Sequence, residues 1–210
     1  MATAIFDLDS YTVLANPTGV LNLPSVGTEN PALRHVGGFV VFGPDGSPVA
    51  YRDDSAPRLR PDFEIWSDDL KQERLLHVQP KEQDGRRGYV VHAGEELIGE
   101  LWPPRSRGLL AKPWSLHDAG GATLGTLGDT KWNHRLKRGL GRAEAESLQL
   151  VGVSDPRPVF FLRQADPLRY MLRVVIPEDS GWDRRLVLAA ALVMPAVEGF
   201  TAFLADDRRR

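Results

Sequence analysis

Short runs of β-branched and aromatic residues, each closed by Gly, Pro, Asp or Asn, recur from about Tyr11 to Ile176. This pattern is typical of many short antiparallel strands. The strand candidates number about a dozen, and a sheet with that many strands usually curls, splits or closes on itself. Outside three hairpins, we expect the strands at 11–15, 63–67, 74–78, 147–153, 159–163 and 168–176.

Three hairpins are recognisable from their turns. The first turn, GPDGS at 43–47, contains a Pro that restricts φ and a Gly suited to the left-handed position. The other two turns, 93–96 and 119–121, also carry Gly. The predicted strand pairs are 39–42 with 48–52, 87–92 with 97–102, and 114–118 with 122–127.

The second and third hairpins resemble each other, because 93–101 aligns with 119–127 without a gap as A-G-x-x-x-[IL]-G-x-L. Two copies of this size indicate repeated strand pairs in one sheet, since a solenoid needs at least three stacked units. Gly99 and Gly125 then fall in mid-strand. We expect each to mark a bulge, a bend or the close approach of a neighbouring element.

The pattern changes after Pro177, where Asp179, Ser180 and Asp183 are candidates for the N-cap of a helix. An Ala- and Leu-rich stretch follows, and we expect one helix at about 183–204. Residues 186–197 are apolar on every helical face, so either protein or lipid must enclose them.

Protein is the favoured environment for this helix. A helix over 186–205 would be about 30 Å long, which is enough to cross a bilayer core. However, Pro195 lies near its middle, and a charge such as that of Glu198 costs roughly 2.5–3.5 kcal/mol at mid-membrane. A surrounding sheet would cover every side of the helix. We therefore predict a mainly β (α+β) fold: a closed antiparallel β-barrel of about twelve strands that encloses the hydrophobic C-terminal helix.

We expect one domain over residues 1–210, with strands at about 11–176, the central helix, and an exposed tail at 205–210. The chain has no Cys, which excludes disulfides, Cys-bound zinc and thiol catalysis. It has 26 basic and 28 acidic residues, so we expect no nucleic-acid partner. The N-terminal residues include no charged leader or apolar signal segment, so we expect a cytoplasmic protein without a transmembrane span.

The second half of the chain resembles the Tubby C-terminal-like superfamily, in the branch of LURP-one-related proteins and phospholipid scramblases. The resemblance covers about 70–204. Its features are the strand RLLHV at 74–78, the hairpin end IGEL at 98–101, the unit WSLHDAGG with LGTL at 114–121 and 124–127, and WDRRLVLAAA at 182–191.

This resemblance implies a twelve-stranded barrel around a central C-terminal helix. It also implies lipid-related functions, since Tubby domains bind phosphoinositide head groups through basic residues and scramblases are implicated in lipid movement and calcium binding. The LURP-one branch largely lacks an assigned activity. The stretch that matches the scramblase calcium segment, 168–176, contains no carboxylate that could hold Ca²⁺. The proline-rich and acylated N-terminal features of scramblases are also missing.

The strongest charge feature lies at 131–142, where five Lys and Arg residues occur without an acidic residue. One interpretation is a loop that binds anionic head groups, with each basic group contributing on the order of 1 kcal/mol near an anionic membrane. The other is a solvated loop whose charges face water. The candidate ligand-binding residues are Lys131, Trp132, His134, Arg135, Lys137, Arg138 and Arg142.

Other chemistry in the sequence is weaker. The five His residues are scattered, although His92 and His117 occupy similar places in the repeated hairpins, beside Asp118. Strand-end histidines commonly bond to a nearby carbonyl. The carboxylates at 53–54, 62, 64, 68–69 and 73 could form a metal or glycosidase site, but their spacing fits turns and strand edges better. We expect no metal and no cofactor.

We therefore expect a non-enzymatic β-barrel module that binds anionic, phosphoinositide-like head groups peripherally at the basic loop. The alternative is a protein–protein interaction or scaffold domain that does not bind lipid, in which the loop and the acidic 53–73 region contact a partner or a second copy. A weaker alternative is a hydrolase with a His and carboxylate site near His92 and His117.

Overall fold

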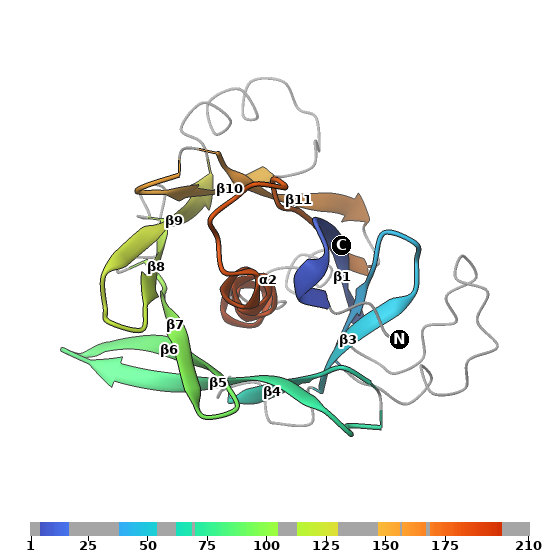
Figure 1. The fold of residues 1–210 in the computed structure, drawn as a ribbon, viewed down its shortest axis with the longest axis horizontal. Coiled ribbons are helices and arrows are strands. Elements are labelled where there is room, and N and C mark those ends of the chain that lie inside the picture. Colours follow the sequence, from blue (N-terminus) through green and yellow to red (C-terminus); the bar gives the residue numbers. More distant parts are fainter. Residues whose placement is uncertain are drawn as a thin grey trace, which may run out of the picture.

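Twelve antiparallel strands form a closed barrel around one helix in the computed structural model of the chain (Figure 1). The structure describes residues 5–16, 38–53, 62–68, 70–104, 113–129, 147–155, 157–166 and 169–198. The strands follow one another around the barrel in chain order, and β1 closes it by pairing with β12. The predicted barrel with an enclosed C-terminal helix is therefore confirmed.

The elements are η1 (Ile5–Asp7), β1 (Ser10–Asn16), β2 (Gly38–Phe42), β3 (Pro48–Asp53), β4 (Phe63–Trp66), β5 (Arg74–Gln83), β6 (Arg86–Ala93), β7 (Glu96–Trp102), β8 (Trp114–Asp118), β9 (Thr123–Asp129), β10 (Ser147–Gly152), β11 (Val159–Asp166), β12 (Arg169–Val175) and α2 (Arg184–Glu198). The three predicted hairpins are present as β2–β3, β6–β7 and β8–β9. The second half of β5, residues 79–83, extends beyond the predicted strand at 74–78.

The alternation of each strand places one set of side chains inside the barrel and the other outside. Leu76 and Val78 of β5 and Leu101 of β7 are fully buried and belong to the main core. Their neighbours Gln79, Lys81 and Glu100 take the opposite face of the sheet, since adjacent strand residues point to opposite sides. The core is therefore the space between the inner wall and the helix.

Helix α2 lies inside the barrel and is seen end-on in the middle of Figure 1. Residues 186–194 are between 0 and 2% exposed, so protein surrounds the apolar helix on all sides, as predicted. Asp183 is the N-cap: its Oδ1 accepts a hydrogen bond from the backbone N–H of Arg185 at 2.9 Å. The described helix ends at Glu198, and the predicted continuation to 204 and the tail at 205–210 lie outside the described residues. Among the described helices, none is long and apolar enough to cross a membrane.

The two repeated glycines occupy points of close approach, as the repeat predicted. A Cβ at Gly99 would lie 2.4 Å from the carbonyl oxygen of His117 and 3.3 Å from the Leu186 side chain. A Cβ at Gly125 would lie 2.3 Å from the carbonyl oxygen of Val151 and 2.7 Å from the Trp182 ring. Each glycine also faces an irregularity in strand pairing, between Val91 and His92 or between Leu116 and His117. Each repeated glycine thus marks a close approach beside an irregular pair of residues in the sheet.

Arg52 is a charged residue inside the barrel, and it was not predicted. It is 4% exposed, and its Nη1 donates a hydrogen bond to the carbonyl oxygen of Leu192 in α2 at 2.6 Å. Its guanidinium also lies 3.8 Å from the ring centre of Phe63 and 4.9 Å from that of Phe39. A hydrogen bond from a charged donor to a buried carbonyl is among the stronger hydrogen bonds in proteins. Arg52 therefore connects β3 to the helix.

Replacing Gly125 with Ala should destabilise the barrel by about 1–3 kcal/mol, because the new methyl group would clash with backbone and with Trp182. Urea unfolding followed by circular dichroism would measure the loss. Gly181→Ala is the control, since a Cβ there meets nothing within 4 Å. Equal stabilities for the two variants would contradict the assigned close approach.

Replacing Arg52 with Met should lower the free energy of unfolding by about 1–3 kcal/mol, because the Leu192 carbonyl loses a buried charged donor. Arg52→Lys should lie between Met and the wild type, since it keeps the charge but not the planar guanidinium. Thermal unfolding of the three proteins would give the order. A Met variant as stable as the wild type would mean that the desolvation of the guanidinium cancels its contacts.

Candidate functional site

The predicted basic loop connects β9 to β10, between Asp129 and Ser147. All seven candidate residues lie outside the described residues. The candidates are Lys131, Trp132, His134, Arg135, Lys137, Arg138 and Arg142. The described strands β9 and β10 show at which end of the barrel this segment begins and ends.

Antiparallel neighbours in chain order place successive connections at alternate ends of the barrel. One end, here called the basic end, receives the connections 17–37, 54–62, 84–85, 103–113, 130–146 and 167–168. The other, here called the acidic end, receives 43–47, 67–73, 94–95, 119–122 and 153–158, together with residues 5–9 before β1 and 176–183 before α2. Helix α2 starts at the acidic end and runs toward the basic end.

The formal charges of the sequence separate between these two ends. The segments at the basic end, counted with 199–210 after α2, contain fourteen Lys and Arg but eight Asp and Glu. The segments at the acidic end contain eleven Asp and Glu but two Lys and Arg. The chain is almost neutral, with a net charge of -2, yet the sequences of the segments that join the strands at the two ends differ strongly in formal charge.

Several carboxylates of the acidic end hold the start of α2. Asp9 accepts a hydrogen bond from Arg184 at 2.6 Å, and Glu96 accepts one from Arg185 at 2.8 Å. Hydrogen bonds from Arg185 hold the pKa of the Asp183 carboxyl below its usual value, although burial opposes this shift. Acidic groups at a helix N-terminus are stabilising because of the helix dipole. The acidic end therefore has a structural role in seating the helix.

Asp155 shows the same pattern in the β10–β11 turn. Its carboxylate accepts hydrogen bonds from the side chain and backbone of Arg157, both at 3.0 Å. The hydrogen bond from the Arg157 side chain is the main cause of a pKa lowered to about 2. This carboxylate thus stays charged at any physiological pH.

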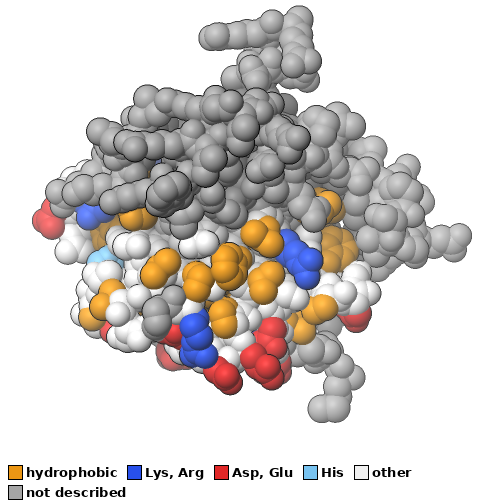
Figure 2. Space-filling view, turned by 90° about the horizontal axis from the view of Figure 1, so that it is seen from above, with side chains coloured by type: hydrophobic (Ala, Val, Ile, Leu, Met, Phe, Trp, Pro, Cys, Tyr) orange, Lys and Arg blue, Asp and Glu red, His pale blue; other side chains and the backbone are white. Residues whose placement is uncertain are grey.

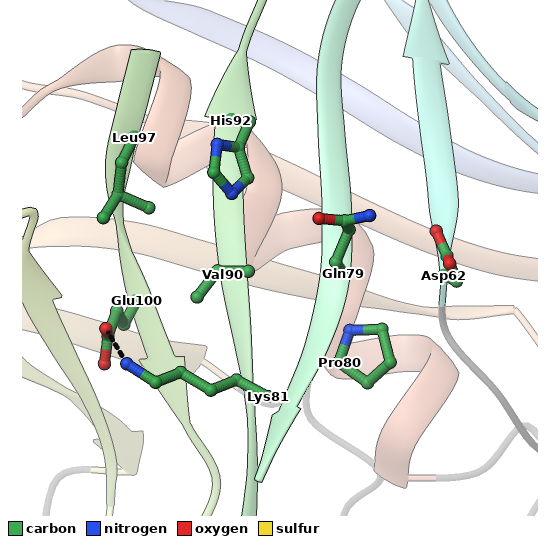
Figure 3. A pocket seen from close by; sticks show the side chains of 8 residues that line it. All are labelled: Asp62, Gln79, Pro80, Lys81, Val90, His92, Leu97 and Glu100. Atoms are coloured by element: carbon green, nitrogen blue, oxygen red, sulfur yellow. Dashed lines mark hydrogen bonds and ion pairs between the residues drawn. The ribbon is translucent and has the colours of Figure 1, made fainter. Parts of the chain in front are cut away.

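A separate feature, the outer hollow, lies on the outside wall of the barrel over β4–β7 and has a volume of about 470 Å³ (Figure 3). Its lining is mixed, with apolar side chains from three strands and polar ones between them. Gln79 and His92 have no side-chain hydrogen-bond partner among the described residues. The lining residues are Asp62, Gln79, Pro80, Lys81, Val90, His92, Leu97 and Glu100.

Glu100 and Lys81 close one side of the outer hollow. Lys81 reaches from β5 across β6 to Glu100 on β7, and the Nζ–Oε1 distance is 2.5 Å (Figure 3). The indole N–H of Trp102 donates to the other carboxylate oxygen at 2.9 Å. Burial opposes ionisation of Glu100, but these hydrogen bonds hold its pKa below the usual value. The pair therefore remains charged, and each charge is largely neutralised by the other.

The described histidines do not form one site. His77 donates from Nε2 to Asp62 at 2.8 Å, and it stands directly opposite His92 on the next strand. His117 donates from Nδ1 to the Gly121 carbonyl at 3.1 Å, which is the kind of contact predicted for a strand-end histidine. His92 lines the outer hollow, whereas His117 does not.

The predicted acidic cluster is divided among local contacts. Glu64 pairs with Arg74 at 2.7 Å, and Asp68 accepts the backbone N–H of Gln72 within its own turn. Asp54 and Asp69 lie outside the described residues. Within the described ranges, no group of three or more His, Asp and Glu side chains is placed to hold a metal ion.

Two of these features escaped the sequence analysis. The Glu100–Trp102 contact had a readable signal, since residues two apart in a strand share a face. The charge separation was also readable in principle, but only after the strand order assigns each connection to an end. Arg52 had no such signal, because the sequence alone does not show which side chains of β3 point into the barrel.

Comparison of the chain with protein-family models, curated proteins and solved structures finds no match.

Replacing Glu100 with Gln should lower the free energy of unfolding at pH 7 by about 1–2 kcal/mol, since charged hydrogen bonds are lost. A lowered pKa means that the folded state favours the ionised form, so this stability is present above the unfolded pKa and is lost as pH falls through the folded value. The difference between variant and wild type should shrink in urea titrations near pH 3. A difference that is independent of pH would contradict the role of the charge.

Proposed function

We propose that the chain is a non-enzymatic β-barrel module that binds anionic lipid head groups at its basic end, through the 131–142 segment. The observation that carries the proposal is the separation of charge along the barrel axis, with fourteen basic residues in the connections of one end. The 131–142 segment starts and returns at that end. The sequences of 103–113, between β7 and β8, and of 199–210, after α2, contain six further Lys and Arg.

The electrostatics favour a peripheral, salt-dependent attachment. Each basic group near an anionic membrane contributes on the order of 1 kcal/mol, and the effect decays within a Debye length of about 8 Å at physiological salt. Eleven acidic residues would oppose binding if they lay at the same end, but the strand order assigns their segments to the other end. The segments assigned to the basic end still contain eight acidic residues, so their fourteen basic residues leave a formal excess of six positive charges in the sequence.

The resemblance to the Tubby C-terminal-like superfamily supports the same function. It implies a barrel with a buried C-terminal helix, and the described residues have that arrangement. Membership of the superfamily remains part of the proposal, because a shared fold does not by itself assign a function.

A protein-interaction domain is the second candidate, and one observation favours it. Apolar side chains lie on the outer face of β10–β12, where Val151 is 40% exposed and Val153 is 73% exposed. Phe160 and Val175 are half-buried and stand opposite each other in β11 and β12. Figure 2 shows hydrophobic side chains across this side of the barrel. Exposed apolar groups of this kind are a common feature of protein contact surfaces.

Co-sedimentation with vesicles tests the lipid proposal. The wild type should bind vesicles that contain phosphatidylserine or a phosphoinositide and should not bind pure phosphatidylcholine vesicles. Arg135→Glu, Lys137→Glu and Arg138→Glu together should lower the bound fraction by about tenfold or more, since they remove and reverse charges worth on the order of 1 kcal/mol each. Raising the salt concentration should weaken wild-type binding.

A matched control carries the same charge change away from the basic end. Lys71→Glu, Arg74→Glu and Arg173→Glu alter exposed residues of the β4–β5 turn, the start of β5 and the outer wall. This control should retain most of the binding. Equal binding to neutral and anionic vesicles, or equal losses in the two triple variants, would refute head-group recognition at the basic end.

A further inference from the structure

We propose that the outer hollow binds an uncharged, polyhydroxylated ring, such as a neutral sugar. Hydrogen-bonding side chains surround the hollow, and an apolar side chain forms its floor (Figure 3). The volume of about 470 Å³ lies within the range of about 300–1,000 Å³ that is common for small-molecule sites. This site consists of described residues alone and does not depend on lipid binding, so the two proposals can fail separately.

Val90 is the floor of the hollow, and polar groups lie around it (Figure 3). It pairs with Gln79 of β5 on one side and with Glu100 of β7 on the other, so the three side chains form one row on the outer wall. His92 lies two residues from Val90 along β6, and Lys81 lies two residues from Gln79 in the opposite direction along the wall. Two residues of a strand span about 7 Å. The floor therefore has a polar group on each of its four sides.

The unused hydrogen-bonding capacity around the floor includes both donors and acceptors. Gln79 and His92 have no side-chain partner among the described residues, and an amide or a neutral imidazole can both donate and accept. The ammonium group of Lys81 has three N–H donors, and the contact with Glu100 uses one of them. A hydroxyl group also donates and accepts. Several hydroxyl groups on one ligand would therefore match these side chains better than a molecule that only donates or only accepts.

The charges of the hollow disfavour an ionic ligand. Lys81 and Glu100 are paired at 2.5 Å, and the remaining charge is that of Asp62, which is exposed and hydrogen-bonded to His77. An anion, including a phosphorylated ring, would be repelled by this carboxylate. A cation on the floor would lie beside the Lys81 ammonium, and both oxygens of Glu100 already accept hydrogen bonds, from Lys81 and from Trp102. An uncharged ligand avoids both conflicts.

The shape of a sugar ring fits an apolar floor with polar sides. Such a ring carries C–H groups on its faces and hydroxyl groups around its edge. Val90 and Leu97 are apolar and half-buried, so a ring lying flat on them would cover apolar surface while its hydroxyl groups reach the polar sides. The lining contains no Phe, Tyr or Trp to stack on the ring. We therefore expect weak binding, with a dissociation constant of about 1–10 mM.

Heteronuclear NMR titration of the isotope-labelled protein tests the proposal. The probes are the methyl glycosides of glucose, galactose and mannose, which differ in the directions of their hydroxyl groups. At least one of them should cause saturable shifts of the backbone amide signals of β5, β6 and β7 around the hollow. Glucose 6-phosphate, as an anionic ring, and butylammonium, as a cation, should cause no saturable shifts of these signals at the same concentration.

Two variants assign the binding to the outer hollow. Val90→Phe fills the floor and should abolish the saturable shifts. Gln79→Ala removes one unpartnered amide and should weaken binding about threefold to tenfold, as expected for the loss of one hydrogen bond. Val151→Phe is the matched control, because it places the same new side chain on the outer wall at an exposed position of β10. This control should bind like the wild type.

Three results would overturn the proposal. The first is the absence of saturable shifts with all three glycosides. The second is unchanged binding in Gln79→Ala and in a Val90→Phe protein that circular dichroism shows to be folded. The third is binding of glucose 6-phosphate or butylammonium at these amides as tight as that of the best glycoside. Each result leaves head-group binding to be judged by vesicle co-sedimentation.

Discussion

The need to cover an apolar helix on every side is the constraint on which this structure depends. A sheet with an open edge could bury one face of α2, but residues 186–194 are buried around the whole circumference of the helix. In this chain the closed wall of twelve strands satisfies that condition. The barrel in turn depends on the helix, since its main core is formed by side chains from both. Wall and helix are therefore parts of a single packing unit.

Charge follows the same axis as the helix. The partial positive charge at the start of α2 meets carboxylates, including the cap at Asp183. Toward the other end, Arg52 supplies a cation to the Leu192 carbonyl from within the core. The formal charge of the segments at each end of the barrel is thus opposite in sign to the partial charge of the helix terminus that points toward that end. Contacts with the start of α2 account for the positions of some acidic residues, but they account for none of the basic residues in 131–142.

Most of the fold could be predicted from the sequence, because it depends on local signals. Turn residues located the three hairpins, and an apolar stretch without a polar face required an enclosed helix. Strand β5 was underestimated because Pro80 usually ends a strand. The pairing of β5 with β4 ends at Val78, so the N–H that Pro80 lacks is not needed for pairing with β4. The outer hollow and Arg52 depend on contacts between distant strands, which no local pattern records. The seven basic-loop residues remain a prediction.

Closure of the barrel by β1 and β12 also has a consequence for how the chain folds as it is made. Thr12 pairs with Arg173, and Val13 with Leu172. The pairing of β1 with β12 can therefore form only after β12 has been synthesised. During synthesis the helix that fills the interior emerges later still. Until then β1 presents an unpaired edge, and the inner wall lacks its filling, which are conditions that favour slow folding and aggregation. The order in which the strands are synthesised thus delays the closure of the barrel until β12 is available to pair with β1.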